Sequence, residues 1–337
     1  MSDKERTDSM DNRKKAVILE SEAVSPGDLS WAPVTDLCDT VLYGNTTEAE
    51  KWERIGDAEV VLTNKVVIDE AVLERFPGIH YVGVCATGYN VVDLEAAARR
   101  GIPVTNVPAY GTDSVAQHAF GLLLDLASKI TMHNASVKSG DWSRVDTFCY
   151  WKAPIIEISG KTLGIYGFGS IGRTVAKIAE SFGMKILVYT AHPEKYTDYA
   201  DEQLCFTDEE TLFGMSDFIT LHCPQTEQTT GLIRRENIEK MKDGVILINV
   251  ARGGLVNEQD LIDALKSGKI GGAGLDVIGK EPMRQDHPLL QAPNLLITPH
   301  IAWASLEARA RLIDIVGANL KGWLEGAPQN VVNKHLL

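Results

Sequence analysis

The sequence is poor in basic residues relative to acidic ones, and this imbalance limits the partners that it predicts. Lys and Arg number 33 against 46 Asp and Glu, which gives a formal net charge of −13 for 337 residues. Nucleic acids and anionic membrane surfaces are bound through clustered basic side chains. The composition therefore argues against both, but it says nothing more about the substrate, because local charge in a cleft can oppose the net charge.

Cysteine is scarce as well, and the five cysteines are scattered without any C-x-x-C pair. This spacing predicts neither a disulfide framework nor a redox pair, and no metal is expected. The N-terminus is polar and charged, and no apolar run approaches the length that spans a bilayer. We therefore expect free thiols and a cytoplasmic location.

What is present suits a globular chain of two domains. A length of 337 residues exceeds that of one typical domain, and contents of 44% hydrophobic and 23% charged residues are ordinary for soluble proteins. Residues 1–15 are polar and have no periodicity. We predict a disordered leader there.

The stretch from residue 160 to residue 190 has the layout of a dinucleotide-binding unit. An apolar run at 163–166 predicts a buried strand, residues 174–182 have helical periodicity, and 185–189 is a second strand. A glycine-rich turn joins the first strand to the helix. This order of strand, turn, helix and strand is the context that a dinucleotide fingerprint requires.

The turn carries Gly167, Gly169 and Gly172 in G-x-G-x-x-G spacing. Such glycines permit a tight turn and let the backbone approach a pyrophosphate, whose charge lies at the N-terminus of the helix. An ordinary glycine-rich turn is the alternative, but it does not require both strands and the helix around it. We predict cofactor contacts from the three glycines and from Ser170 and Ile171.

Strands alternate with helices in the first part of the chain too. Helical stretches at 48–55, 69–76 and 93–100 separate short apolar runs that predict strands at 16–19, 41–43, 60–62, 81–84 and 104–105. This alternation implies parallel sheets with helices on their faces, so the fold class is α/β.

Two long helices divide the chain. One begins at residue 114 and continues to about residue 133, leaving the first domain, and another at 305–323 returns to it. We predict a leader of residues 1–15, a substrate domain of 16–112 and 300–337, a dinucleotide-binding domain of 113–299, and a cleft between the two domains.

Arg252, Glu281 and His300 each come shortly after a predicted strand. Ligands of open α/β sheets bind outside the carboxyl ends of the strands. The planar fork of Arg252 suits the carboxylate or keto oxygen of a 2-keto acid, and His300 can donate a proton to that oxygen as hydride arrives at carbon. Glu281 would hold the other imidazole nitrogen and favour the imidazolium.

Taken singly, these three residue types are common in surface ion pairs, turns and structural positions. Their order after a dinucleotide fingerprint predicts reduction of a 2-keto acid instead. The other seven of the 8 histidines show no such placement, and we expect them to be structural or exposed.

From about residue 16 onward, the chain resembles the D-isomer-specific 2-hydroxyacid dehydrogenase family. Arg252 and Glu281 are 29 residues apart (281 − 252), as the family's arginine and glutamate typically are. The segments that match the family's motifs are 86–93, 106–110, 249–256 and 298–304.

The resemblance implies two Rossmann-like domains, a flavodoxin-like substrate domain and a dinucleotide-binding domain. It implies NAD or NADP as cofactor and Arg252, Glu281 and His300 as catalytic residues. By the same resemblance, backbone N–H groups of the loop at 85–89 would bind the substrate carboxylate, through Ala86, Thr87 and Gly88. Asp276 would bind the nicotinamide carboxamide, and further cofactor contacts would come from Cys223, Pro224, Val250, Ala251 and His300.

Within the family, residues 148–152 and 300–305 resemble bacterial glycerate dehydrogenases, also called hydroxypyruvate reductases. Hydroxypyruvate or glyoxylate is therefore the expected substrate. Formate dehydrogenases are similar but usually carry glutamine where Glu281 stands. Two alternatives stay open, namely phosphoglycerate dehydrogenase activity and a dinucleotide-sensing scaffold such as the C-terminal-binding corepressors, which keep the catalytic set.

The end of the strand at 185–189 bears on the choice of cofactor. NAD-preferring members have an acidic residue there that binds the ribose hydroxyls. Here the position 18 residues past Gly172 (190 − 172) is Thr190, with His192 and Lys195 close behind. These three side chains can contact a 2′-phosphate, although no arginine stands at this position. We predict weak discrimination between NADP and NAD.

The segment at 146–158 is too apolar for a simple solvated loop, and it includes Phe148, Tyr150 and Trp151. We predict a homodimer formed through the dinucleotide-binding domain, with contributions from the helix that starts at residue 114. In this hypothesis the segment crosses to the partner and Trp151 reaches the partner's substrate site. The alternative is that the segment caps its own domain.

Overall fold

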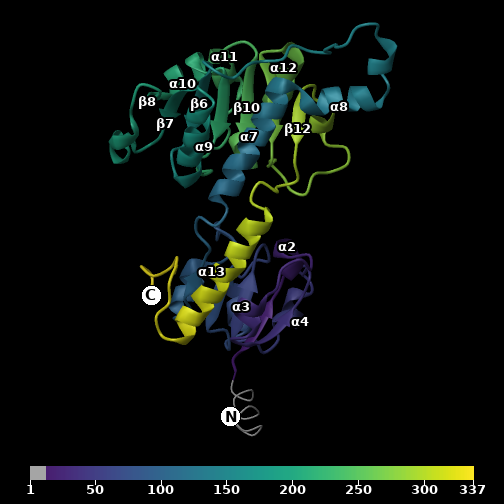
Figure 1. Cartoon of the computed structure of the whole chain (residues 1–337). Helices are drawn as coiled ribbons and strands as arrows, with labels where there is room; N and C mark the ends of the chain where they lie inside the picture. The colour runs from purple at the N-terminus through teal and green to yellow at the C-terminus, as the bar shows by residue number, and fades with distance from the viewer. Residues whose placement is uncertain (1–12) are drawn as a thin grey trace. The chain divides into compact units, whose positions relative to one another are not determined.

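The computed structural model describes residues 13–337, and these form two compact units (Figure 1). Unit 1 holds the described residues up to Gly111 together with Ala304–Leu337, and unit 2 holds Thr112–Trp303. Most of the predicted leader lies outside the described residues. Its last residue, Lys15, is the first residue of a strand, and the ammonium group of Lys14 lies 2.7 Å from a carboxylate oxygen of Glu59.

Unit 1 is built on a parallel sheet with the strand order β2-β1-β3-β4-β5. Every residue of β3 and β4 is buried, as expected for central strands covered on both faces. The order 2-1-3-4-5 is that of flavodoxin-like sheets, so the predicted fold type is confirmed. The strands are β1 (Lys15–Ile18), β2 (Asp39–Leu42), β3 (Val60–Thr63), β4 (Tyr81–Val84) and β5 (Val104–Thr105).

Three helices of unit 1 begin where a polar side chain caps the free N–H groups of the first turn. Asp69 accepts a hydrogen bond from the N–H of Val72, and Asp93 accepts one from Ala96. The helices are α2 (Ser21–Val24), α3 (Ala32–Thr35), α4 (Lys51–Ile55), α5 (Glu70–Arg75), α6 (Leu94–Arg99) and α13 (Leu306–Leu324).

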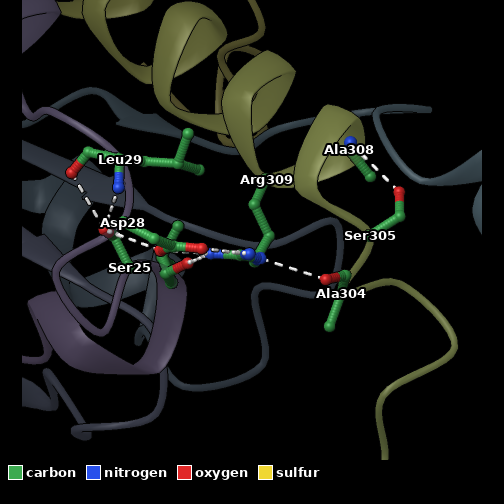
Figure 2. Close-up of polar contacts among 8 residues, drawn as sticks. Ser25, Asp28, Leu29, Ala304, Ser305, Ala308 and Arg309 are labelled. Carbon is green, nitrogen blue, oxygen red and sulfur yellow. Dashed lines mark hydrogen bonds and ion pairs between the residues drawn. The ribbon is translucent and has the colours of Figure 1, made fainter.

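Arg309 joins the last helix of the chain to its beginning (Figure 2). Its guanidinium donates to both carboxylate oxygens of Asp28, at 2.9 and 2.6 Å, and to the carbonyl oxygens of Val24 and Ala304. Such a bidentate pair fixes the relative orientation of the guanidinium and the carboxylate as well as the distance between them. The Arg309 guanidinium also lowers the pKa of the Asp28 carboxyl group. This contact joins α13 to residues near the beginning of the chain. Arg309 and Asp28 are 281 positions apart in the sequence.

Unit 2 is built on a larger parallel sheet with the strand order β12-β11-β10-β9-β6-β7-β8. Read from β8, the order is the doubly wound Rossmann order 3-2-1-4-5-6 with one further strand. Its switch point lies between β6 and β9, where the order of strands reverses. The strands are β6 (Thr162–Tyr166), β7 (Lys185–Tyr189), β8 (Leu204–Phe206), β9 (Phe218–Leu221), β10 (Val245–Asn249), β11 (Ile270–Leu275) and β12 (Leu295–Ile297).

Helices cover both faces of this sheet (Figure 1). One apolar cluster joins α7 and α9 to the sheet, and a second lies beneath α10, α11 and α12. The helices are α7 (Thr112–Ser128), α8 (Ile130–Lys138), α9 (Ser170–Ser181), α10 (Glu209–Met215), α11 (Arg235–Lys240) and α12 (Glu258–Ser267).

The single helix predicted from residue 114 to residue 133 is wrong in its second half. Helix α7 ends at Ser128, Lys129 adopts a left-handed conformation with φ of 55°, and α8 begins at Ile130. The carboxylate of Asp125 accepts a hydrogen bond from the N–H of Thr131 at 2.7 Å and so stabilises the break. Apolar periodicity continues across a break of this kind, which is why the pattern did not indicate it.

Within residues 13–337, no helix combines the length and the apolar character needed to cross a bilayer. No group of three or more His, Cys, Asp and Glu side chains in the same range is arranged to hold a metal ion. All five cysteines are free, and burial raises the pKa of the Cys85 thiol to about 12 and that of Cys223 to about 11. Both thiols are therefore protonated, and weakly nucleophilic, at neutral pH.

Candidate active site

His300 and Glu281 are hydrogen-bonded to each other beyond the carboxyl ends of β11 and β12. The Nδ1 atom of His300 lies 2.7 Å from Oε2 of Glu281. The two side chains are 32% and 37% exposed, so both keep access to solvent or ligand. Because the carboxylate holds Nδ1, the nitrogen that remains for a substrate is Nε2. The structure thus brings together two of the three predicted catalytic residues.

The backbone of His300 is held in an unusual conformation. Its φ of 56° is in the left-handed region, which residues other than glycine seldom adopt. Its N–H donates to the carbonyl oxygens of Asp276 and Thr298, at 2.9 and 3.0 Å. Its own carbonyl oxygen accepts a hydrogen bond from Nε1 of Trp303 at 2.9 Å. These contacts fix the direction in which the imidazole leaves the backbone.

Asp276 is the buried centre of this turn, with only 2% of its surface exposed. Its Oδ1 accepts hydrogen bonds from the Thr298 hydroxyl at 2.6 Å and from the N–H of Ile301 at 2.9 Å, and its Oδ2 accepts one from the N–H of Ala302 at 2.8 Å. A carboxylate has about four acceptor sites. The remaining site, on Oδ2, accepts no hydrogen bond from the described residues, and the side chain is almost fully covered.

His118 takes part in the same network, although no pattern in the sequence indicated this role. From α7, its Nε2 lies 2.9 Å from the Thr298 hydroxyl and 3.5 Å from Oδ1 of Asp276. Because Thr298 donates its single proton to Asp276, Nε2 of His118 must carry the proton in its own contact with Thr298. The two residues are 180 positions apart, so no local pattern relates them. His118 helps to orient the turn that carries His300.

Arg252 lies in the loop that follows β10. The side chain of Asn249, which is fully buried, organises this loop by donating to the carbonyl oxygen of Arg252 and accepting from the N–H of Ala251. A Cβ atom at Gly253 would lie 1.9 Å from the carbonyl oxygen of Ile278. Only glycine fits there, and the close approach sets the loop against the segment that leads to Glu281.

The Arg252 side chain is exposed, and its Nη1 donates to the carbonyl oxygen of Ala251 at 2.7 Å. No carboxylate within the described part of the chain forms an ion pair with it. Most of the N–H donors of this guanidinium are therefore free to bind an anionic ligand.

The glycine turn has the shape that a dinucleotide pyrophosphate requires. A Cβ atom at Gly172 would lie 2.2 Å from the carbonyl oxygen of Gly167, and one at Gly167 would lie 2.7 Å from the nitrogen of Cys223. A Cβ atom at Gly169, in contrast, would meet nothing within 4 Å, so this side of the turn is open to a ligand.

No side chain caps the N-terminus of α9, which the glycine turn leads into. The N–H groups of Ser170 and Ile171 donate to no acceptor within residues 13–337. Unsatisfied N–H groups and the positive end of the helix dipole favour a bound anion. The residues present therefore fit a dinucleotide pyrophosphate.

The other predicted cofactor contacts follow neighbouring parallel strands, so they lie along the same edge of the sheet. Thr190 follows β7, and beyond it Nδ1 of His192 lies 3.3 Å from a carboxylate oxygen of Glu194. The remaining members of this set are Cys223 and Pro224 after β9, and Val250 and Ala251 after β10.

In unit 1, the loop of residues 85–89 follows β4. The Thr87 hydroxyl donates to the carbonyl oxygen of Val107 at 2.8 Å, and the Asn106 amide donates to the carbonyl oxygen of Thr87 at 2.7 Å. The N–H groups of Ala86, Thr87 and Gly88 have no acceptor within residues 13–337. The loop is thus held through its carbonyl and hydroxyl groups, and its N–H groups remain available to an anion.

The segment of residues 146–158 is anchored within unit 2 but exposes large apolar side chains. The Tyr150 hydroxyl contacts that of Ser136 at 2.8 Å, and Ile156 packs against the core beside α7. Between and beside these anchors, Phe148 is 88% exposed and Trp151 is 69% exposed. The segment does not bury these rings against its own domain.

A glycine turn at the switch point of a Rossmann sheet, with an arginine and a histidine–glutamate pair beyond the strand ends, defines a dinucleotide-dependent oxidoreductase. Residues 120–302 match the family model of the D-isomer specific 2-hydroxyacid dehydrogenase NAD-binding domain. The chain belongs to the D-isomer-specific 2-hydroxyacid dehydrogenase family, as its motifs predicted.

Similar proteins cover most of the chain. A hydroxypyruvate reductase of Blautia hydrogenotrophica is 47% identical over 323 residues, which is 95% of this chain and 100% of that protein. A glycerate dehydrogenase of Methylorubrum extorquens is 43% identical over 288 residues, which is 85% of this chain and 89% of that protein. The solved structure of the acyclic imino acid reductase Bsp5 in complex with NADPH and D-Arg has a TM-score of 0.80 at 28% identity, covering 94% of this chain and 99% of that one.

Proposed function

We propose that the protein reduces hydroxypyruvate or glyoxylate to the corresponding 2-hydroxy acid, the D isomer in the case of hydroxypyruvate, with NAD(P)H as hydride donor. The observation that carries the proposal is the contact of 2.7 Å between His300 and Glu281, in the same unit as the unpaired guanidinium of Arg252. The names of the two similar proteins, a hydroxypyruvate reductase and a glycerate dehydrogenase, support this substrate class.

Each of the three residues has one task in the proposed reaction. When bound, the reduced nicotinamide supplies the hydride to the keto carbon. The Arg252 fork binds the substrate carboxylate or the keto oxygen, where negative charge develops. Nε2 of His300 donates its proton to that oxygen, so the product is a neutral hydroxyl group beside the carboxylate. Glu281 holds Nδ1 and stabilises the imidazolium before the proton leaves.

The N–H groups of Ala86, Thr87 and Gly88 are proposed to bind the substrate carboxylate. Their lack of acceptors in residues 13–337 supports this role. In the same proposal, Asp276 contacts the nicotinamide carboxamide through its remaining acceptor site.

A panel of 2-keto acids, each assayed with NADH and with NADPH, tests the proposed substrate class. We expect hydroxypyruvate and glyoxylate to give the highest kcat/KM values, ahead of pyruvate and of 3-phosphohydroxypyruvate. A preference for the phosphorylated acid would instead support phosphoglycerate dehydrogenase activity. Tight cofactor binding without turnover of any acid in the panel would support the scaffold alternative.

We propose that the protein discriminates weakly between the two cofactors and accepts NADP(H) at least comparably to NAD(H). Thr190 brings no carboxylate to repel a 2′-phosphate, and His192 and Lys195 lie a few residues beyond it. The measurement is kcat/KM for NADH and NADPH at saturating keto acid. A preference for NADH of about a hundredfold or more, worth about 2.7 kcal/mol, would contradict weak discrimination.

Replacing Glu281 with Gln is expected to lower kcat for reduction and to leave cofactor binding nearly unchanged. The Glu281 carboxylate accepts from Nδ1 of His300 at 2.7 Å and so directs Nε2 toward the substrate. A glutamine amide can donate to Nδ1 as well as accept from it, so it no longer holds the imidazole in one arrangement, and kcat should fall by roughly tenfold or more. Glu239→Gln, at an exposed position of α11, is the matched control. An unchanged kcat would show that Glu281 does not position the histidine.

We further propose that the protein is a homodimer and that the segment at 146–158 contacts the partner, with Trp151 reaching the partner's substrate site. The exposure of Phe148 and Trp151 supports this assembly, and Ile155, which is 59% exposed, extends the same apolar surface. Exposed apolar groups of this size are typical of interfaces. Residues of α8 that are also exposed and apolar are Ile130, Met132 and Val137.

The triple variant Phe148→Ser, Trp151→Ser and Ile155→Ser is expected to elute as a monomer at micromolar concentration, whereas the wild type elutes as a dimer. Each large apolar side chain withdrawn from an interface costs about 1.5–3 kcal/mol, or roughly tenfold or more in the dimer dissociation constant. Met215→Ser, at a residue that is 56% exposed elsewhere in unit 2, should stay dimeric. An active wild-type monomer would contradict the assembly.

A further inference from the structure

Arg173 is a cation without a carboxylate partner beside the glycine turn. It lies in the first turn of α9, and its Cζ is 5.7 Å from the ring centre of Tyr196 and 5.8 Å from that of Tyr199. No carboxylate within residues 13–337 forms an ion pair with it. Two aromatic faces hold the guanidinium in place without using its N–H donors. The side chain is half-buried, so it is positioned and still accessible.

The rings under Arg173 belong to the segment that follows β7. This segment forms two short 3-10 turns, Pro193–Lys195 and Thr197–Tyr199, beyond Thr190. Phe168, the residue between the first two glycines of the fingerprint, makes edge-on contacts with Tyr196 at 5.4 Å and with Tyr199 at 5.5 Å. A third edge-on contact, with Phe206 of β8 at 5.3 Å, completes the aromatic cluster. The cluster ties the segment after β7 to the glycine turn.

Two phosphates of a dinucleotide are candidates for such a cation, namely the pyrophosphate and the 2′-phosphate of NADPH. The pyrophosphate already has the free N–H groups of Ser170 and Ile171 and the positive end of α9. The 2′ position of the adenosine ribose lies at the end of the second strand, where Thr190 stands and where the tyrosine-bearing segment begins. The location of the rings therefore favours the 2′-phosphate.

We propose that Arg173, held on Tyr196 and Tyr199, recognises the 2′-phosphate of NADPH. This inference rests on the proposed use of NAD(P)H and identifies the residue that admits the phosphorylated cofactor. No arginine stands between Thr190 and Tyr199, and the structure supplies one from the neighbouring helix α9 instead. A planar guanidinium suits a phosphate dianion because two N–H groups can bind two oxygens at once.

Calorimetric titration with 2′,5′-ADP and with 5′-ADP separates the two phosphates without requiring turnover. For Arg173→Gln, we expect the dissociation constant of 2′,5′-ADP to rise by about tenfold or more, the usual worth of a hydrogen bond to a charged group, and that of 5′-ADP to stay within about twofold. Lys177→Gln removes the same charge one turn later on the exposed side of α9 and should change neither constant.

Two further variants test the geometry. Arg173→Lys keeps the charge without the planar fork, so 2′,5′-ADP should bind with intermediate affinity. Tyr196→Leu removes one supporting ring and should weaken 2′,5′-ADP more than 5′-ADP. If Arg173→Gln does not fold, the same comparison with Arg173→Lys decides the question.

A loss of affinity for 5′-ADP as large as that for 2′,5′-ADP, or larger, would assign Arg173 to the 5′-phosphates and overturn the proposal. Unchanged affinity for both would overturn it as well. The keto-acid panel uses the wild type and does not depend on this result, so failure of the Arg173 assignment and failure of the proposed reaction remain distinguishable.

Discussion

Replacing His300 with Gln is expected to lower kcat for keto-acid reduction by about 10² or more, the typical contribution of a general acid. Hydride delivered to the keto carbon leaves negative charge on its oxygen, and a proton must reach that oxygen as the charge develops. Glutamine has a similar reach and can donate a hydrogen bond, but it cannot give up a proton at neutral pH. Steady-state kinetics with hydroxypyruvate, or whichever keto acid proves best, measure the loss.

Cofactor binding should hardly change in His300→Gln, because the glycine turn and the N-terminus of α9 do not contact this side chain. The dissociation constant of NADPH, followed by its fluorescence, checks this separation. His80→Gln, at an exposed position of unit 1, is the matched control and should keep the wild-type rate. A rate close to wild type in His300→Gln would show that another group protonates the oxygen.

The fold was largely predictable because its signals are local. Each parallel strand is a short apolar run, and helices begin at residues such as Asp69 and Asp93, whose side chains cap them. The glycine fingerprint was predictable for the same reason, since its turn, helix and flanking strands occupy one continuous stretch. Boundaries were less exact, as shown by α7, which ends at Ser128 although apolar residues continue beyond the break at Lys129.

The placement of Arg252, Glu281 and His300 was predictable because they follow successive strands, and parallel strands end at one edge of a sheet. The residues that support the set were not predictable. His118 reaches Thr298 across 180 positions, and the side chain of Asn249 acts within a buried loop. The position of Arg173 over Tyr196 and Tyr199 was not predictable either, because it depends on how α9 packs against the segment after β7. Such contacts depend on tertiary packing, which a single sequence does not display.

Replacing Arg252 with Ala should raise KM and lower kcat together. The guanidinium is proposed to contact the substrate before hydride transfer and to stabilise the charge that forms on the oxygen during it, so both parameters depend on it. A bidentate hydrogen bond between charged groups is worth about 3 kcal/mol, which corresponds to a loss of roughly 10² in kcat/KM. The His300→Gln variant differs because its loss is confined mainly to kcat.

The structure makes Arg252→Ala a clean test of the guanidinium. The loop around it is held by the Asn249 side chain, which contacts the carbonyl oxygen of residue 252 and the N–H of Ala251, and by the close packing of Gly253 against Ile278. Alanine keeps all of these contacts, so the loop should retain its shape.

Arg252→Lys should recover only part of the activity, because an ammonium group lacks the planar fork. Arg234→Ala, at an exposed ion pair with Glu236, should behave as wild type. If Arg252→Ala raises KM but leaves kcat unchanged, the guanidinium binds the substrate equally well in the ground and transition states, and its proposed contact with the developing charge is wrong.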